Sequence, residues 1–112
     1  MQQIEMEIKK LLSKYSREDI GFGKTENYIL ERINATKEDV ATDLLSLENL
    51  ELVEEQKRNN EIRYVLFFVY SKKSGRVYVI TLREKLRIIT AYPLGKKTLS
   101  KYNKRRFINS KR

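Results

Sequence analysis

Side chains suited to chemistry on a charged substrate are concentrated near the end of the chain, in the stretch IITAYPLGKKTLSKYNKRRF at residues 88–107. The stretch begins as an apolar strand, expected over residues 86–92. Side chains alternate between the two faces of a strand, so we expect Thr90 and Tyr92 to share one face. A tyrosine can move protons in the absence of histidine, and its ring can stack on an unpaired base.

The same stretch continues as an expected short basic helix over residues 96–105. Lysines spaced at i, i+4 and i+7 form one cationic stripe on a helix. These lysines are Lys97, Lys101 and Lys104, and the stripe is extended by Arg105 and Arg106. Such a stripe suits backbone phosphates, and its cations can stabilise the added negative charge of a phosphate transition state. The large apolar groups between the lysines argue against a purely solvating tail.

The charge of the chain is asymmetric along its length. The net charge of +9 comes from 24 basic and 15 acidic residues. Every acidic residue lies at or before Glu84, so residues 85–112 carry ten lysines and arginines and no acid. This asymmetry indicates a polyanionic partner, with nucleic acid favoured over an anionic membrane surface.

Missing residue types exclude several other chemistries. The chain has no histidine and no cysteine, which removes the commonest general base, the commonest metal ligand and any disulfide. The GKT at residues 23–25 lacks the first glycine of a phosphate-binding loop, because Glu18 stands in its place. We therefore expect no metal and no cofactor. No apolar run is long enough to span a bilayer and no signal peptide is evident, so we expect a cytoplasmic protein.

The elements that position these side chains are expected to be helices first and strands afterwards. Helical spacing predicts an amphipathic helix over residues 2–15 and a second over 26–34 that buries Tyr28. A third helix begins at the capping sequence TKED, at Thr36. Strands are expected over residues 63–70, 77–82 and 86–92, and residues 47–60 are ambiguous between a short edge strand and a polar turn.

These elements predict a single α+β domain over residues 1–112. It has N-terminal helices, a three- to four-stranded antiparallel meander, and a short basic C-terminal helix or tail. The first of its strands, RYVLFFVY, is apolar on both faces, so we expect it to be central and covered on both sides. The helix over residues 2–15 is an addition to the core layout, and residues 108–112 are expected to be a flexible tail.

This layout resembles the small RelE- and BrnT-like toxins, part of a larger barnase- and EndoU-like ribonuclease grouping. The resemblance spans residues 22–107. It is carried by the last strand with its basic tail, and by an ER pair, Glu31-Arg32, followed by a capped helix at residues 36–40. Many relatives have a histidine ahead of the ER pair, whereas this chain reads GKTENY there.

What the resemblance implies is metal-independent cleavage of RNA, in which the 2′-hydroxyl attacks the neighbouring phosphate. The implied catalytic residues are Thr90, Tyr92, Lys97, Tyr102 and Arg105. The implied nucleic-acid-binding residues are Arg76, Arg83, Lys96, Lys97, Lys101, Lys104, Arg105 and Arg106, with the first two holding phosphate from a neighbouring hairpin. RNA is accordingly favoured over DNA as the partner.

Other functions stay open. One is a non-catalytic DNA- or RNA-binding regulator, including a winged-helix arrangement, although the helices over residues 26–34 and 37–46 show no basic recognition face. Another is a protein whose basic end docks on an acidic protein partner or a membrane surface. A strand edge around residues 47–53 would also be available to a second copy, which would give a homodimer.

Overall fold

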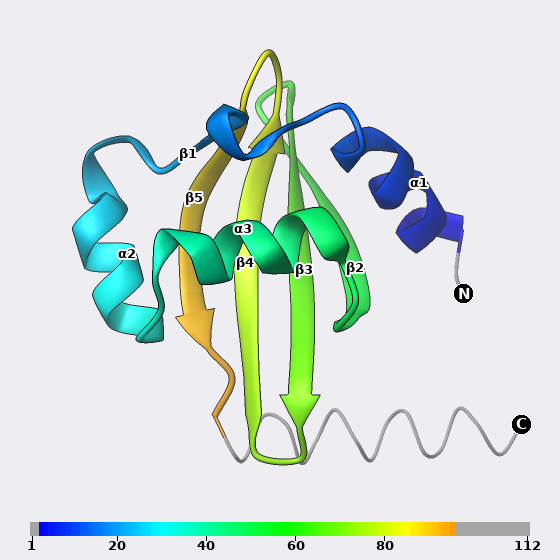
Figure 1. Cartoon of the computed structure of the whole chain (residues 1–112). Helices are drawn as coiled ribbons and strands as arrows, with labels where there is room; N and C mark the ends of the chain where they lie inside the picture. The colour runs from blue at the N-terminus through cyan, green and yellow to red at the C-terminus, as the bar shows by residue number, and fades with distance from the viewer. Residues whose placement is uncertain (1–2, 96–112) are drawn as a thin grey trace, which may run out of the picture.

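The computed structural model describes residues 3–95, which fold as helices packed on one face of a five-stranded sheet (Figure 1). The helices are α1 (Gln3–Leu12), α2 (Glu26–Ile33) and α3 (Lys37–Ser46). The strands are β1 (Ile20–Gly21), β2 (Leu50–Arg58), β3 (Glu61–Ser71), β4 (Ser74–Leu82) and β5 (Leu86–Pro93). The α+β class is confirmed, and every strand except the two-residue β1 follows the three α-helices. The basic helix expected over residues 96–105 and the tail over 108–112 lie outside the described residues.

The sheet is mixed and has the strand order β1-β5-β4-β3-β2. Strands β2 to β5 form the antiparallel meander that the sequence predicts. The ambiguous segment is a full nine-residue edge strand, β2. The sheet has one strand beyond the predicted three or four, because β1 pairs in parallel with β5 through Ile20 and Gly21. Two residues inside a glycine-containing connection give no periodic signal from which a strand can be predicted.

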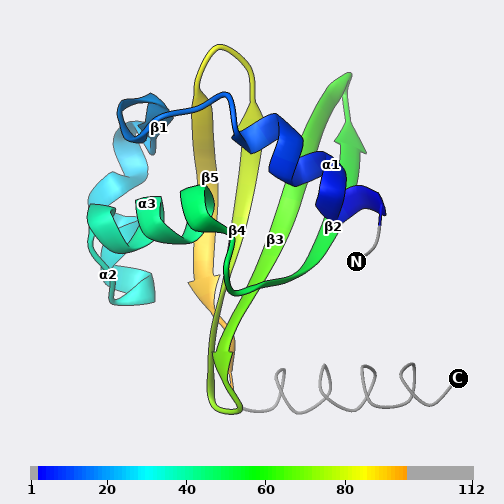
Figure 2. The same ribbon diagram turned by 45° about the vertical axis from the view of Figure 1, so that its right-hand side comes forward.

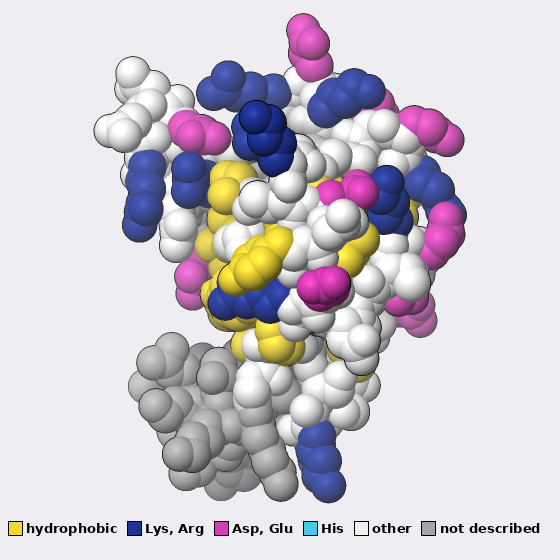
Figure 3. All heavy atoms as spheres, turned by 90° about the vertical axis from the view of Figure 1, so that its left-hand side faces the viewer, with side chains coloured by type: hydrophobic (Ala, Val, Ile, Leu, Met, Phe, Trp, Pro, Cys, Tyr) yellow, Lys and Arg dark blue, Asp and Glu magenta, His cyan; other side chains and the backbone are white. Residues whose placement is uncertain are grey.

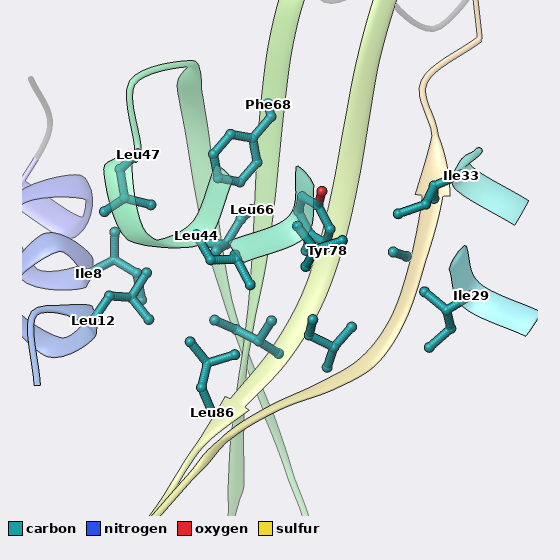
Figure 4. Close-up of a cluster of buried hydrophobic side chains, with 14 of the residues drawn as sticks. Ile8, Leu12, Ile29, Ile33, Leu44, Leu47, Leu66, Phe68, Tyr78 and Leu86 are labelled. Carbon is teal, nitrogen blue, oxygen red and sulfur yellow. The ribbon is translucent and has the colours of Figure 1, made fainter. Parts of the chain in front are cut away.

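The main hydrophobic core lies between the helices and the sheet (Figure 4). Each helix contributes buried aliphatic side chains: Ile8 and Leu12 from α1, Ile29 and Ile33 from α2, and Leu44 from α3. They pack against Leu66, Phe68 and Tyr78 of the central strands, all of which are fully buried. Removal of this apolar surface from water provides the main driving force that holds the helices on the sheet.

The ends of α2 and α3 follow from local chemistry. Thr36 and Asp39 form the predicted capping box, with the Asp39 N–H donating to Thr36 Oγ1 at 3.2 Å and the Thr36 N–H to Asp39 Oδ2 at 2.9 Å. Helix α2 ends at Asn34, which adopts the left-handed conformation at φ 51°. Asparagine tolerates that conformation better than most residues. These two signals fix where α2 ends and where α3 begins.

The opposite face of the sheet carries none of the described helices (Figure 2). We call it the open face. Residues 3–95 therefore cover β3 on one side only, whereas the sequence predicts a strand covered on both sides. Among these residues, no helix is long and apolar enough to cross a membrane.

Candidate nucleic-acid interface

A row of side chains with an aromatic ring at each end crosses the open face. In the register of the sheet, Val77 of β4 pairs with Phe67 of β3 on one side and with Tyr92 of β5 on the other. The two aromatic residues are thus two strands apart, about 10 Å at the usual spacing of strands. Both are partly exposed and pack against the buried Val77 and Leu94. The open face therefore presents two separate aromatic rings on an aliphatic floor.

The next row along the strands carries a hydroxyl group. It consists of Val65, Val79 and Thr90, which are cross-strand partners in the same register. Thr90 is partly exposed, and it lies on the same face as Tyr92. The predicted sharing of a face by these two residues therefore agrees with the register.

A third row carries arginines. Thr81 pairs with Arg87 of β5, and Arg63 lies on its other side, because the next residue, Tyr64, pairs with Ile80. The Nη2 atom of Arg63 is 3.7 Å from Glu61 Oε2, and its buried Nε has no hydrogen-bond partner in the described part of the chain. Arg87 is exposed, and its guanidinium turns toward Gly23. Two cations thus stand at the opposite end of the open face from the aromatic row.

Helix α2 adds a cation and an aromatic ring beside β5. The guanidinium carbon of Arg32 lies 5.6 Å from the centre of the Tyr92 ring, a cation–π distance. Tyr28 precedes Arg32 by one helical turn, so the two share a side of the helix. The prediction that Tyr28 is buried was wrong, because it is 64% exposed. Figure 3 shows this side of the molecule, where hydrophobic and basic side chains lie against one another.

The predicted phosphate-binding arginines of the neighbouring hairpin do not come together. Arg76 lies near the start of β4 and Arg83 follows its end, a separation of about 20 Å along an extended strand. Arg76 points to the helix-covered face, where its Nη1 is 3.2 Å from Asp43 Oδ2. Arg83 lies in the turn before β5, and its carbonyl accepts a hydrogen bond from the Tyr15 hydroxyl.

The remaining predicted residues belong to the basic segment after Gly95. They are Lys96, Lys97, Lys101, Tyr102, Lys104, Arg105 and Arg106, and all lie outside the described residues. The described chain ends beside the aromatic row, because the Leu94 N–H donates to the Gly75 carbonyl at 2.9 Å and Leu94 packs in the open-face cluster. The last described residues therefore lie at the open face.

A buried polar cluster lies on the helix-covered face, where α3 meets the sheet. Asp43 accepts hydrogen bonds from Tyr70, from Tyr78 at 2.6 Å and from Arg76 at 3.2 Å. Burial, and then the hydrogen bond and charge of Asp43, raise the pKa of both tyrosines above the ordinary value. The two phenols therefore keep their protons to a higher pH than an ordinary tyrosine does. This cluster binds α3 to the sheet and offers no proton acceptor to the open face.

The site residues predicted from the sequence did not include Arg63, Phe67 or Arg87. Arg63 and Phe67 lie four positions apart on one strand, so they share a face, which the sequence does indicate. Their alignment with Tyr92 and Arg87 depends on strand register, which is shifted by an irregularity between Val79 and Ile80. No local pattern specifies that shift.

The chemistry of the open face has to be inferred from its own geometry. Within residues 3–95, no three acidic side chains come together to hold a metal ion. The resemblance to the RelE- and BrnT-like toxins stays a prediction. No protein-family model, no curated protein and no solved structure matches this chain.

Proposed function

We propose that the chain binds single-stranded RNA on the open face of its sheet, and that the basic segment from Lys96 onward extends the same surface. The observation that carries this proposal is the combination of two aromatic rings and two arginines on one uncovered face, with the described chain ending beside the rings just before a segment rich in lysine and arginine. Phe67 and Tyr92 are the rings, and Arg63 and Arg87 are the arginines.

The chemistry of these groups suits an unpaired strand better than a duplex. Stacking of a base on an aromatic ring contributes about 1–3 kcal/mol and requires a base that is free of its partner. Arginine binds phosphate through a planar fork of donors. The Thr90 hydroxyl, between the two rows, can accept from or donate to a 2′-hydroxyl, the group that distinguishes RNA from DNA.

We propose further that the chain cleaves the RNA that it binds, following the resemblance to the RelE- and BrnT-like toxins. The 2′-oxygen would attack the adjacent phosphorus while the 5′-oxygen leaves, giving a 2′,3′-cyclic phosphate. Tyr92 would donate its phenol proton to the leaving 5′-oxygen, and water would carry the 2′-hydroxyl proton back to the phenolate, while the cations of the basic segment would stabilise the phosphate charge. Support for Tyr92 comes from its place on the open face beside Arg32.

The test is to incubate the full chain with labelled single-stranded RNA in EDTA and to measure both anisotropy and fragment ends. We expect binding that weakens steeply with salt, because phosphate contacts release counterions. Fragments that end in 2′,3′-cyclic phosphate support cleavage, and intact RNA supports binding alone. Absence of binding at low salt contradicts the proposal, and stronger binding to duplex DNA supports a DNA-binding regulator instead.

Substitutions on the open face test whether RNA binds there. Phe67→Leu or Tyr92→Leu keeps the apolar floor but removes a stacking ring, so affinity should fall about tenfold. Arg63→Gln and Arg87→Gln should each flatten the salt dependence. Arg17→Gln is the matched control, because Arg17 is exposed and paired with Glu38 on α3, away from the open face. If the control weakens binding as much as the Arg87 variant, the site lies elsewhere.

A further inference from the structure

The outer edge of β2 has no strand partner within residues 3–95, because β2 ends the sheet order. From Leu52 to Arg58 the strand pairs with β3 in unbroken register, and it contains no proline. Residues 54–58 are all exposed. A regular, unpaired strand edge is a template for a further strand.

The charges along this edge are antisymmetric about Gln56. The sequence Glu54-Glu55-Gln56-Lys57-Arg58 has two acids before the glutamine and two bases after it. If the order of these five residues is reversed and the sign of each charge is exchanged, the same pattern of charges results. Charged residues on an edge commonly prevent pairing by repulsion. Here an antiparallel second copy would instead meet the opposite charge at each charged position.

Symmetry restricts how two copies of β2 can pair. An antiparallel pair has its two-fold axis perpendicular to the sheet, and cross-strand partners must point to the same face. One residue must then lie opposite the same residue of the second copy, next to the two-fold axis. We call this residue the centre of the pairing. A centre at Glu54, Glu55, Lys57 or Arg58 places like charges directly opposite each other. A centre at Val53 places Glu51 opposite Glu55.

A centre at Gln56 avoids these repulsions. It pairs Glu54 with Arg58 of the other copy and Glu55 with Lys57 of the other copy, each twice by symmetry. Glu54 shares the open face with Val65, and Glu55 shares the helix-covered face with Tyr64, so both faces gain opposite-charge pairs. Such cross-strand pairs favour association, whereas like charges oppose it.

We propose that the chain forms a homodimer through antiparallel pairing of β2 with β2 of a second copy, centred on Gln56. The pairing joins two five-stranded sheets into one of ten strands. Because the axis is perpendicular to the sheet, both open faces lie on the same side of the dimer. The proposal rests on the edge and its charges and not on the RNA-binding function.

The test compares the full chain with two charge variants by sedimentation equilibrium. E54K/E55K makes the edge wholly basic, and K57E/R58E makes it wholly acidic. In either variant alone the dimer dissociation constant should rise by at least about tenfold, since every attractive pair becomes repulsive. A mixture of the two variants should form a heterodimer as stable as the wild-type dimer. The wild-type dimer should weaken as salt rises.

A fourth chain, E54K/E55R/K57E/R58E, inverts every charge but keeps the antisymmetry and the net charge, so it should dimerise like the wild type. Circular dichroism checks that each variant is folded, as expected for exposed positions. A wild-type chain that remains monomeric at the highest concentration reached overturns the proposal. A dimer that persists in both double variants also overturns it, because another surface then holds the copies together.

Discussion

At the scale of single residues, the buried Asp43 explains why α3 keeps a fixed position on the sheet. Its carboxylate is nearly inaccessible and satisfies the hydroxyls of Tyr70 and Tyr78 together with the Arg76 guanidinium. The guanidinium also lies over the Tyr70 ring, 5.2 Å from its centre. Each of these groups would be costly to bury alone, because an unsatisfied buried polar group gives up its hydrogen bonds to water. The cluster thus uses Arg76, a predicted phosphate-binding residue, for structure.

This cluster predicts how stability depends on alkaline pH. Burial raises the pKa of Tyr70 above the ordinary value of 10.0, so below pH 10 both the folded and unfolded states hold the proton. Above pH 10 only the unfolded state releases it, and the free energy of unfolding falls by up to about 1.4 kcal/mol per pH unit for each such tyrosine. Tyr70→Phe should therefore make this decline shallower, as measured by urea unfolding between about pH 9 and about pH 11.5, on either side of the ordinary tyrosine pKa.

The same substitution should also lower stability at pH 7 by about 1 kcal/mol, because it removes a hydrogen bond to Asp43. Tyr28→Phe is the matched control, since that hydroxyl is on a side chain that is 64% exposed. The Tyr28→Phe variant should show the same dependence of the free energy of unfolding on pH as the wild type. An unchanged alkaline slope in the Tyr70 variant would show that the phenol is not held protonated by the fold.

At the scale of elements, the close packing of β3 and of Leu94 against β4 depends on Gly75. A Cβ atom built there would lie 2.7 Å from the Phe68 carbonyl oxygen and 2.7 Å from Leu94 Cδ1. The backbone oxygen cannot move as a flexible side chain can. Gly75→Ala should therefore lower the free energy of unfolding by about 1–3 kcal/mol, measured by urea titration. Gly21→Ala is the control, because nothing lies within 4 Å of its Cβ position. Equal decreases in the two variants would contradict this packing.

The elements also show what the sequence could and could not predict. Helix α3 was predictable because its capping box and apolar stripe are local signals, and the antiparallel meander was predictable from β-branched and aromatic runs. Strand β1 was not, because its pairing with β5 joins residues that are distant in the chain. Tyr28 was assigned to the core by its spacing, but its helix lies at the margin of the sheet beside β5, where that position faces water.

The site was less predictable than the fold for the same reason. Thr90 and Tyr92 share a face by alternation alone. Phe67 and Arg63 join them only through pairing of β3, β4 and β5, and that pairing includes a shift that no local motif encodes. The apolar character of β3 on both sides suggested a second covering layer, which the described residues do not supply.

At the scale of the whole molecule, charge is distributed so that residues 1–95 together are nearly neutral. Residues 96–112 hold eight of the 24 basic side chains and no acid, so residues 1–95 hold 16 basic and 15 acidic side chains. Long-range attraction to a polyanion should therefore depend mainly on the final segment, whereas stacking depends on the open face. The two contributions can be separated by experiment.

Charge reversal at Lys97 and Lys101 tests this division. The double variant Lys97→Glu and Lys101→Glu should weaken binding to all single-stranded RNA sequences alike, because phosphate contacts carry no sequence information. The slope of log affinity against log salt should become shallower by about 0.7 for each phosphate that the variant no longer neutralises. Lys9→Glu with Lys10→Glu on α1 is the matched control, because it makes the same change in net charge on the helix-covered side. A decrease in affinity for one sequence only would mean that these lysines read bases, and an equal effect in the control would mean that net charge alone governs binding.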